Sequence, residues 1–144
     1  MPRVNFYIWI ACVFFLIVSC AKVEYYEADK RLISERLGLY LHDVEVLSHS
    51  LGENKETIFL RSAPYRVITD KEIADALSWQ LEAKGFKQRC RNYNELPIFG
   101  GPFYRVGLST SYGLAVIITV KPQREVDVHM VQIEYIKDMP ILPC

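Results

Sequence analysis

The chain has no surplus of charge of either sign. Its 144 residues include 17 lysines and arginines against 17 aspartates and glutamates, which gives a formal net charge of zero at pH 7. Proteins that bind nucleic acid through its phosphates generally carry a clear excess of positive charge. The composition therefore gives no electrostatic reason to expect a nucleic-acid partner.

Motifs for common catalytic and cofactor chemistry are missing as well. The sequence contains no HExxH, CxxC, GxSxG or GxGxxG pattern and no phosphate-binding P-loop in a recognisable context. It has only three histidines and four cysteines, and no internal repeat stands out. We therefore expect no cofactor and no metal site.

Apolar residues are plentiful. They make up 51% of the chain, and aromatic residues make up 12%. A disordered chain would be poorer in both, and a chain of this length suits one domain rather than two. The sequence therefore predicts one folded domain with a real hydrophobic core.

The first 19 residues differ from the rest. Arg3 is followed by a charge-free run of 18 residues, from Val4 to Ala21. A secretory signal peptide has a short positive segment and then about 7–15 apolar residues, whereas a membrane-spanning helix needs about 20. The run therefore fits a signal peptide better than a membrane span.

The run ends in the residues IVSC at positions 17–20, which resemble the lipobox of bacterial lipoproteins. In that family the cysteine sulfur receives a diacylglyceryl group, the chain is cut just before the cysteine, and the new amine is acylated, commonly with palmitate. The resemblance covers this segment alone. It implies a signal peptide over residues 1–19, a lipid on Cys20 and a short tether over residues 20–28.

Ala21, rather than an aspartate, follows Cys20. This is similar to the enterobacterial pattern for lipoproteins of the outer membrane, so the resemblance implies a protein that is anchored there and faces the periplasm. The alternative is an uncleaved signal anchor, in which Cys20 is an ordinary thiol at the membrane face.

Two helices are expected in the body of the protein. Apolar residues recur at helical spacing over 29–41, although Gly38 weakens that prediction. The residues Thr69 to Glu72 form a capping box, and Gly85 suits the end of a helix. The second pattern predicts a helix over 70–84.

Several strands are expected around these helices. The apolar stretch 114–120 predicts a strand that is covered on both faces, and a phase change in the last strand predicts a β-bulge near Met130. The other predicted strands cover 44–47, 57–60, 65–68, 86–91, 104–109 and 126–136. The pattern indicates an α+β fold over residues 29–144: a two-layer sandwich with one mainly antiparallel sheet and helices on one face.

Two cysteines remain in the expected mature chain. Cys12 would leave with the signal peptide and Cys20 would carry the lipid, which leaves Cys90 and Cys144. In a compartment that oxidises thiols, we expect these two to form a disulfide. The alternative is that Cys90 is a small buried side chain and Cys144 a free thiol at the end of the chain.

Candidate catalytic residues are few. Asp127 and His129 lie two residues apart in the last predicted strand and so would share one face, where a carboxylate could orient an imidazole base. We interpret this pair as part of a solvated strand face and predict no catalytic residue. His49 is expected to be exposed in a turn.

The most plausible binding feature is a loop that contains Gly100, Gly101, Phe103 and Tyr104. Permissive glycines beside aromatic side chains often shape a loop that contacts a partner. These residues are therefore the candidate partner-binding loop; the alternative is that the glycines only turn the chain into the next strand.

Together these patterns predict a small lipoprotein of the cell envelope that binds or assembles with an envelope protein and performs no catalysis. One alternative is an envelope hydrolase that uses His129 and Asp127. Another is an anchored accessory subunit of a transport or secretion complex.

Overall fold

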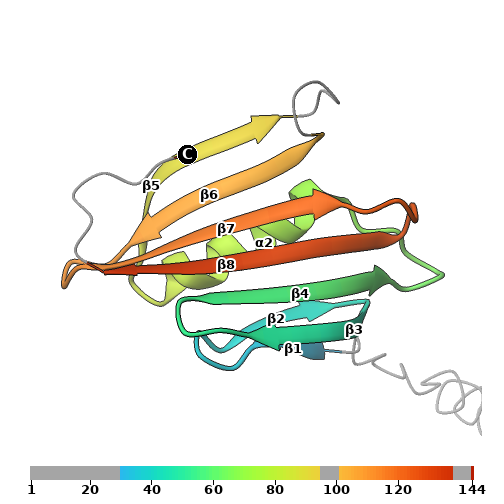
Figure 1. Cartoon of the computed structure of the whole chain (residues 1–144), viewed down its shortest axis with the longest axis horizontal. Helices are drawn as coiled ribbons and strands as arrows, with labels where there is room; N and C mark the ends of the chain where they lie inside the picture. The colour runs from blue at the N-terminus through green and yellow to red at the C-terminus, as the bar shows by residue number, and fades with distance from the viewer. Residues whose placement is uncertain (1–29, 95–100, 138–143) are drawn as a thin grey trace, which may run out of the picture.

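A computed structural model describes residues 30–94, 101–137 and 144. These residues form eight strands and one helix (Figure 1). The elements in chain order are β1 (Lys30–Ser34), β2 (Leu39–His42), β3 (Val44–Leu51), β4 (Lys55–Ser62), α2 (Asp70–Ala83), β5 (Lys87–Asn94), β6 (Phe103–Ser109), β7 (Leu114–Pro122) and β8 (Val128–Lys137).

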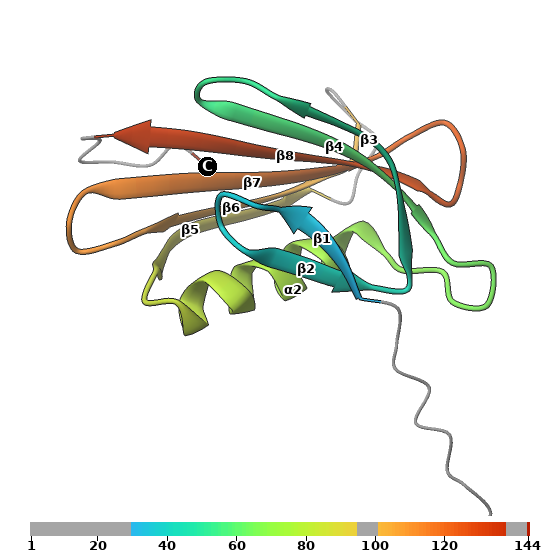
Figure 2. The ribbon, with the colours of Figure 1, turned by 90° about the horizontal axis from the view of Figure 1, so that it is seen from below.

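Six of the strands form one sheet, in the order β3-β4-β8-β7-β6-β5, and β1 pairs with β2 in a separate hairpin. Every pairing is antiparallel. The prediction of a mainly antiparallel sheet is therefore confirmed. Figure 2 shows α2 and the β1–β2 hairpin on the same side of the six-stranded sheet.

The core lies between this sheet and the elements that cover it. Alternate residues of β4 are buried, whereas β7 is buried without a break from Ala115 to Val120, as the sequence predicts. One cluster joins the sheet, α2 and the hairpin, and its fully buried side chains include Leu39, Leu60, Leu77 and Ile118.

The predicted helix over residues 29–41 is wrong, because this segment forms the β1–β2 hairpin. Its apolar side chains fit helical spacing, but they also alternate at Leu39 and Leu41, which are buried on either side of the half-buried Tyr40. Gly38 adopts a φ of +59° in the turn, a conformation that glycine reaches without steric cost. The sequence predicts a layer of two helices, whereas the structure has one helix, α2, and the β1–β2 hairpin.

The predicted helix over residues 70–84 is confirmed as α2. Thr69 Oγ1 accepts a hydrogen bond from Glu72 N (3.2 Å), and Thr69 N donates to Glu72 Oε2 (2.8 Å), which completes the capping box. At the other end, Gly85 has a φ of +94° and its amide donates to Glu82 O. Both ends thus follow from local sequence signals.

The predicted β-bulge near Met130 is wrong. β8 pairs with β4 and β7 without a register shift. The apolar phase changes because His129, rather than an apolar residue, occupies the core-facing row with Val131 and Ile133. Val126 precedes the strand and is 90% exposed.

Smaller differences concern strand ends. The segment 65–68, predicted to be extended, forms no strand, and β3 continues to Leu51, so His49 lies in a strand rather than in a turn. No helix in the described part of the chain is both long and apolar enough to cross a membrane.

Candidate functional site

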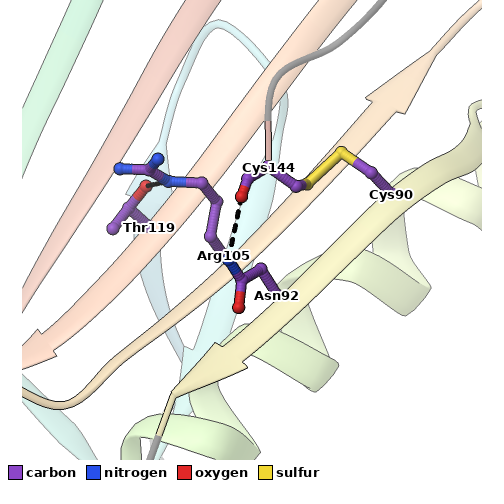
Figure 3. The surroundings of a disulfide bond; sticks show 5 residues. All are labelled: Cys90, Asn92, Arg105, Thr119 and Cys144. Atoms are coloured by element: carbon purple, nitrogen blue, oxygen red, sulfur yellow. Dashed lines mark hydrogen bonds between the residues drawn. A yellow bond between two sulfur atoms is a disulfide. The ribbon is translucent and has the colours of Figure 1, made fainter.

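Cys90 on the edge strand β5 is joined by a disulfide to Cys144, with their Cα atoms 5.9 Å apart (Figure 3). Asn92 Nδ2 donates a hydrogen bond to the main-chain oxygen of Cys144 (2.9 Å). The predicted pairing is confirmed. It attaches the last residue of the chain to β5, although two strands, β6 and β7, separate β5 from β8, the preceding element.

The candidate partner-binding loop falls partly outside the described residues, which do not include Gly100. Gly101 has a φ of +82°, and Phe103 and Tyr104 begin β6. The Tyr104 ring packs against the Tyr93 ring at 4.9 Å and borders the core, whereas Phe103 lies under the Arg105 guanidinium. The two aromatic side chains of the predicted loop therefore have different surroundings.

Asp127 and His129 do not form a pair. His129 is buried, with only 3% of its surface exposed, so its prediction as a solvated strand residue is wrong. Its ring nitrogens bond to Ser62 and Asp70 instead. The carboxylate of Asp127 lies 3.5 Å from Arg61 Nε, near the β7–β8 turn. The structure therefore gives His129 a different acidic partner from the expected one.

The side chains of Ser62, His129 and Asp70 form a hydrogen-bonded chain. Ser62 Oγ lies 3.1 Å from His129 Nε2, and His129 Nδ1 lies 2.6 Å from Asp70 Oδ1. This connectivity matches that of a serine hydrolase triad, in which an acid orients a histidine base next to the hydroxyl nucleophile. Ser62 ends β4, Asp70 begins α2 and His129 lies in β8, so the chain also ties three elements together.

The hydroxyl and the amides around Ser62 are already engaged. Ile68 N donates to Ser62 Oγ (3.1 Å), Ser62 N donates to Asp127 O, and Ala63 N donates to Asp43 O. A hydrolase needs amide hydrogens directed at the developing oxyanion. Because these amides already have acceptors and Ser62 is buried, the arrangement favours a structural role.

A cleft of about 510 Å³ lies beside the hydrogen-bonded side chains of Ser62, His129 and Asp70. Its lining includes Arg31, Asp43, Tyr65 and Ser62. Asp43 joins β2 to β3 with a φ of +59°, which is uncommon for a residue with a side chain. Its carboxylate accepts a hydrogen bond from Tyr65 (2.9 Å) and pairs with Arg66 (3.3 Å). These contacts hold the loop after β4 against the turn before β3.

A second polar cluster lies at the other end of β4 from Ser62, on the same buried face of the strand. Glu56 is fully buried, and its carboxylate accepts hydrogen bonds from Ser34 Oγ (2.9 Å) and the Tyr135 hydroxyl, with His49 Nε2 3.0 Å away. Buried carboxylates need such partners. The cluster joins β1, β3, β4 and β8.

Sequence reasoning missed Glu56, Ser62 and Asp70 as interacting residues. Glu56 shares its alternation with Ile58 and Leu60, and this signal could have placed it on the buried face of β4. Asp70 is the first residue of α2, where an acidic side chain is common, so its position gives no sign of a further partner. Ser62 carries no comparable signal, because its partners lie 6 and 67 residues away.

The Tyr135 phenol carries a testable pH dependence. Burial, followed by the hydrogen bond to the Glu56 carboxylate, raises the pKa of Tyr135 well above its usual value. The unfolded phenol ionises near pH 10, at about its usual pKa, while the folded phenol keeps its proton. The stability that this group contributes is therefore full below about pH 10 and is lost as the pH rises further.

We expect the urea midpoint of the Tyr135→Phe variant to fall less steeply than that of the wild type as the pH is raised above about 10. Urea unfolding at a series of alkaline pH values measures this. Equal slopes for the two proteins would show that the Tyr135 phenol does not titrate differently in the folded and unfolded states.

The described residues contain no group of three or more His, Cys, Asp or Glu side chains placed to hold a metal ion. The features of the candidate site are the disulfide, the hydrogen-bonded side chains of Ser62, His129 and Asp70, the cluster around Glu56, and the cleft beside Ser62. No protein-family model, curated protein or solved structure matches this chain.

Proposed function

We propose that this protein is a small lipid-anchored protein of the bacterial cell envelope, whose mature form begins at lipidated Cys20. The observation that carries the proposal is the disulfide between Cys90 and Cys144. Disulfides persist in oxidising compartments such as the periplasm and are rare in the cytosol. The lipobox resemblance at residues 17–20 supplies the means of attachment.

The proposed place of the protein is the outer membrane, facing the periplasm, because Ala21 follows Cys20. Residues 29–144 act as one domain, in which α2 and the β1–β2 hairpin form a second layer over the sheet. The proposed role is binding to, or assembly with, an envelope protein. In support of a role without catalysis, the polar groups of both buried clusters hydrogen-bond to one another and to neighbouring main-chain amides.

An envelope hydrolase is the second candidate, and one observation favours it. The Ser62–His129–Asp70 chain has the connectivity of a catalytic triad and borders a cleft. A fluorophosphonate probe, which reacts with activated serines, tests this candidate. We expect no labelling of the native protein. Labelling that disappears in Ser62→Ala would replace the proposed role by serine hydrolysis.

The anchoring proposal predicts that Cys20→Ala abolishes lipidation and signal cleavage. Cells fed an alkyne fatty acid should label the wild-type protein and leave the variant unlabelled. Cys12→Ala is the matched control, because Cys12 lies within the proposed signal peptide and its loss should change neither result. A wild-type protein that carries no label and retains residues 1–19 would favour the uncleaved signal anchor.

A further inference from the structure

We infer that the end of the domain from which the tether leaves rests on the lipid surface, with Tyr65, Val67 and Val126 entering the headgroup region. The inference deepens the proposed function and rests on lipid anchoring through Cys20. It adds which face of the body meets the membrane and which side chains make the contact.

Four parts of the chain meet at this end. Lys30, the first described residue after the tether, pairs with His42 next to Asp43. Asp43 O accepts a hydrogen bond from Ala63 N, just beyond β4 (2.8 Å). Asp127 O, in the β7–β8 turn, accepts one from Ser62 N (2.9 Å). The views agree, because the start of β1, the β4–α2 loop and the β7–β8 turn lie at the same end (Figures 1 and 2).

Large apolar side chains are exposed at this end. Tyr65 is 64% exposed, Val67 is 62% exposed and Val126 is 90% exposed. Tyr65 and Val67 lie in the loop after β4, and Val126 lies in the β7–β8 turn. Exposed aliphatic and aromatic side chains on two neighbouring loops suit shallow entry into a membrane interface, where tyrosine is enriched.

Basic residues accompany these apolar side chains. Arg66 lies between Tyr65 and Val67, and Arg124 lies two residues before Val126. Acidic residues balance them, since Asp43 pairs with Arg66, and Arg61 pairs with both Glu125 and Asp127. The charges at this end are therefore close to balanced, and the exposed apolar side chains carry the expected contact with lipid.

The tether keeps this end close to the membrane. Residues 21–29 lie between the proposed lipidated cysteine and the described body, and nine residues can span at most about 30 Å. Anchoring thus holds the body within a short distance of the bilayer and gives a high effective concentration for a weak second contact. Under these conditions a weak contact through three exposed side chains contributes to the orientation of the body more than it would in an untethered domain.

Tryptophan fluorescence tests this orientation with a built-in control. Trp79 is the only tryptophan after residue 19, it is 64% exposed, and it follows Asp70 by nine residues. It therefore lies about 13 Å along α2 from Asp70, the first residue of the helix. Its exposure matches that of Val67, so the two positions differ mainly in their distance from the proposed membrane contact.

The lipidated mature protein is reconstituted into vesicles of phosphatidylcholine and phosphatidylglycerol that contain an acyl-brominated phosphatidylcholine. The reporter variants carry Val67→Trp or Val126→Trp in a Trp79→Phe background. Bromine quenching should lower the tryptophan emission of each variant by a factor of about two or more. Native Trp79 in the otherwise unchanged protein should lose little. Two reporter positions are used so that a folding defect in one variant, seen by circular dichroism, leaves the other to decide.

Vesicle flotation separates the failure of this inference from the failure of anchoring. If the wild-type protein does not float with the vesicles, the lipid anchor is wrong and the inference falls with it. If the protein floats but both reporters remain unquenched, the anchor stands and the contact is wrong. Equal quenching of native Trp79 would also overturn the inference, because the body would then lie on its side.

Discussion

Replacement of both Cys90 and Cys144 by serine is expected to lower the free energy of unfolding by about 4 kcal/mol. The disulfide closes a loop across a sequence separation of 54 residues. In the chain-entropy account, this loop restricts the unfolded chain and thus raises its free energy relative to the folded state. Since small domains have a stability of about 5–15 kcal/mol, the loss would leave the protein close to unfolding at growth temperature.

Urea unfolding of the oxidised wild type, the reduced wild type and the double variant measures this effect. The reduced wild type serves as the control for the substitutions, and it should match the double variant. An unfolding free energy of the double variant within about 0.5 kcal/mol of the oxidised wild type would show that the disulfide does not constrain the chain.

His129→Ala is expected to lower the free energy of unfolding by about 3 kcal/mol. The substitution removes a buried ring and leaves Ser62 Oγ and the Asp70 carboxylate without this partner. The Asp70 side chain is only 13% exposed, so solvent compensates for the loss poorly. A surface histidine would give a change within about 0.5 kcal/mol.

A double-mutant cycle with Ser62→Ala distinguishes the hydrogen-bonded chain from simple loss of volume. If Ser62 and His129 act together, the loss in the double variant should be smaller than the sum of the two single losses by about 1 kcal/mol. Strict additivity would show that the two side chains contribute independently. A wild-type stability in His129→Ala would restore the interpretation of His129 as a solvated residue.

The parts of the fold that follow from local sequence were predictable. The ends of α2 are fixed by the capping box at Thr69 and by Gly85. The central strand β7 carries its signal in an unbroken apolar stretch. The disulfide followed from counting the thiols that remain after residue 20.

The parts that depend on distant residues were not predictable. The 29–41 segment has helical spacing, but packing of Leu39 and Leu41 against α2 and the sheet favours a hairpin. His129 finds its partners 59 and 67 residues away, and Tyr135 meets Glu56 across 79 residues. No local pattern records such contacts, because strand order in the sheet brings the residues together.

The intact mass of the protein, extracted from cell envelopes without reductant, tests the central claim most directly. We predict a chain that begins at Cys20, carries a diacylglyceryl group and an amide-linked acyl chain, and has lost two hydrogens to the bond between Cys90 and Cys144. A mass that corresponds to the chain from Met1, or to a mature chain without lipid, would contradict the account of an envelope lipoprotein.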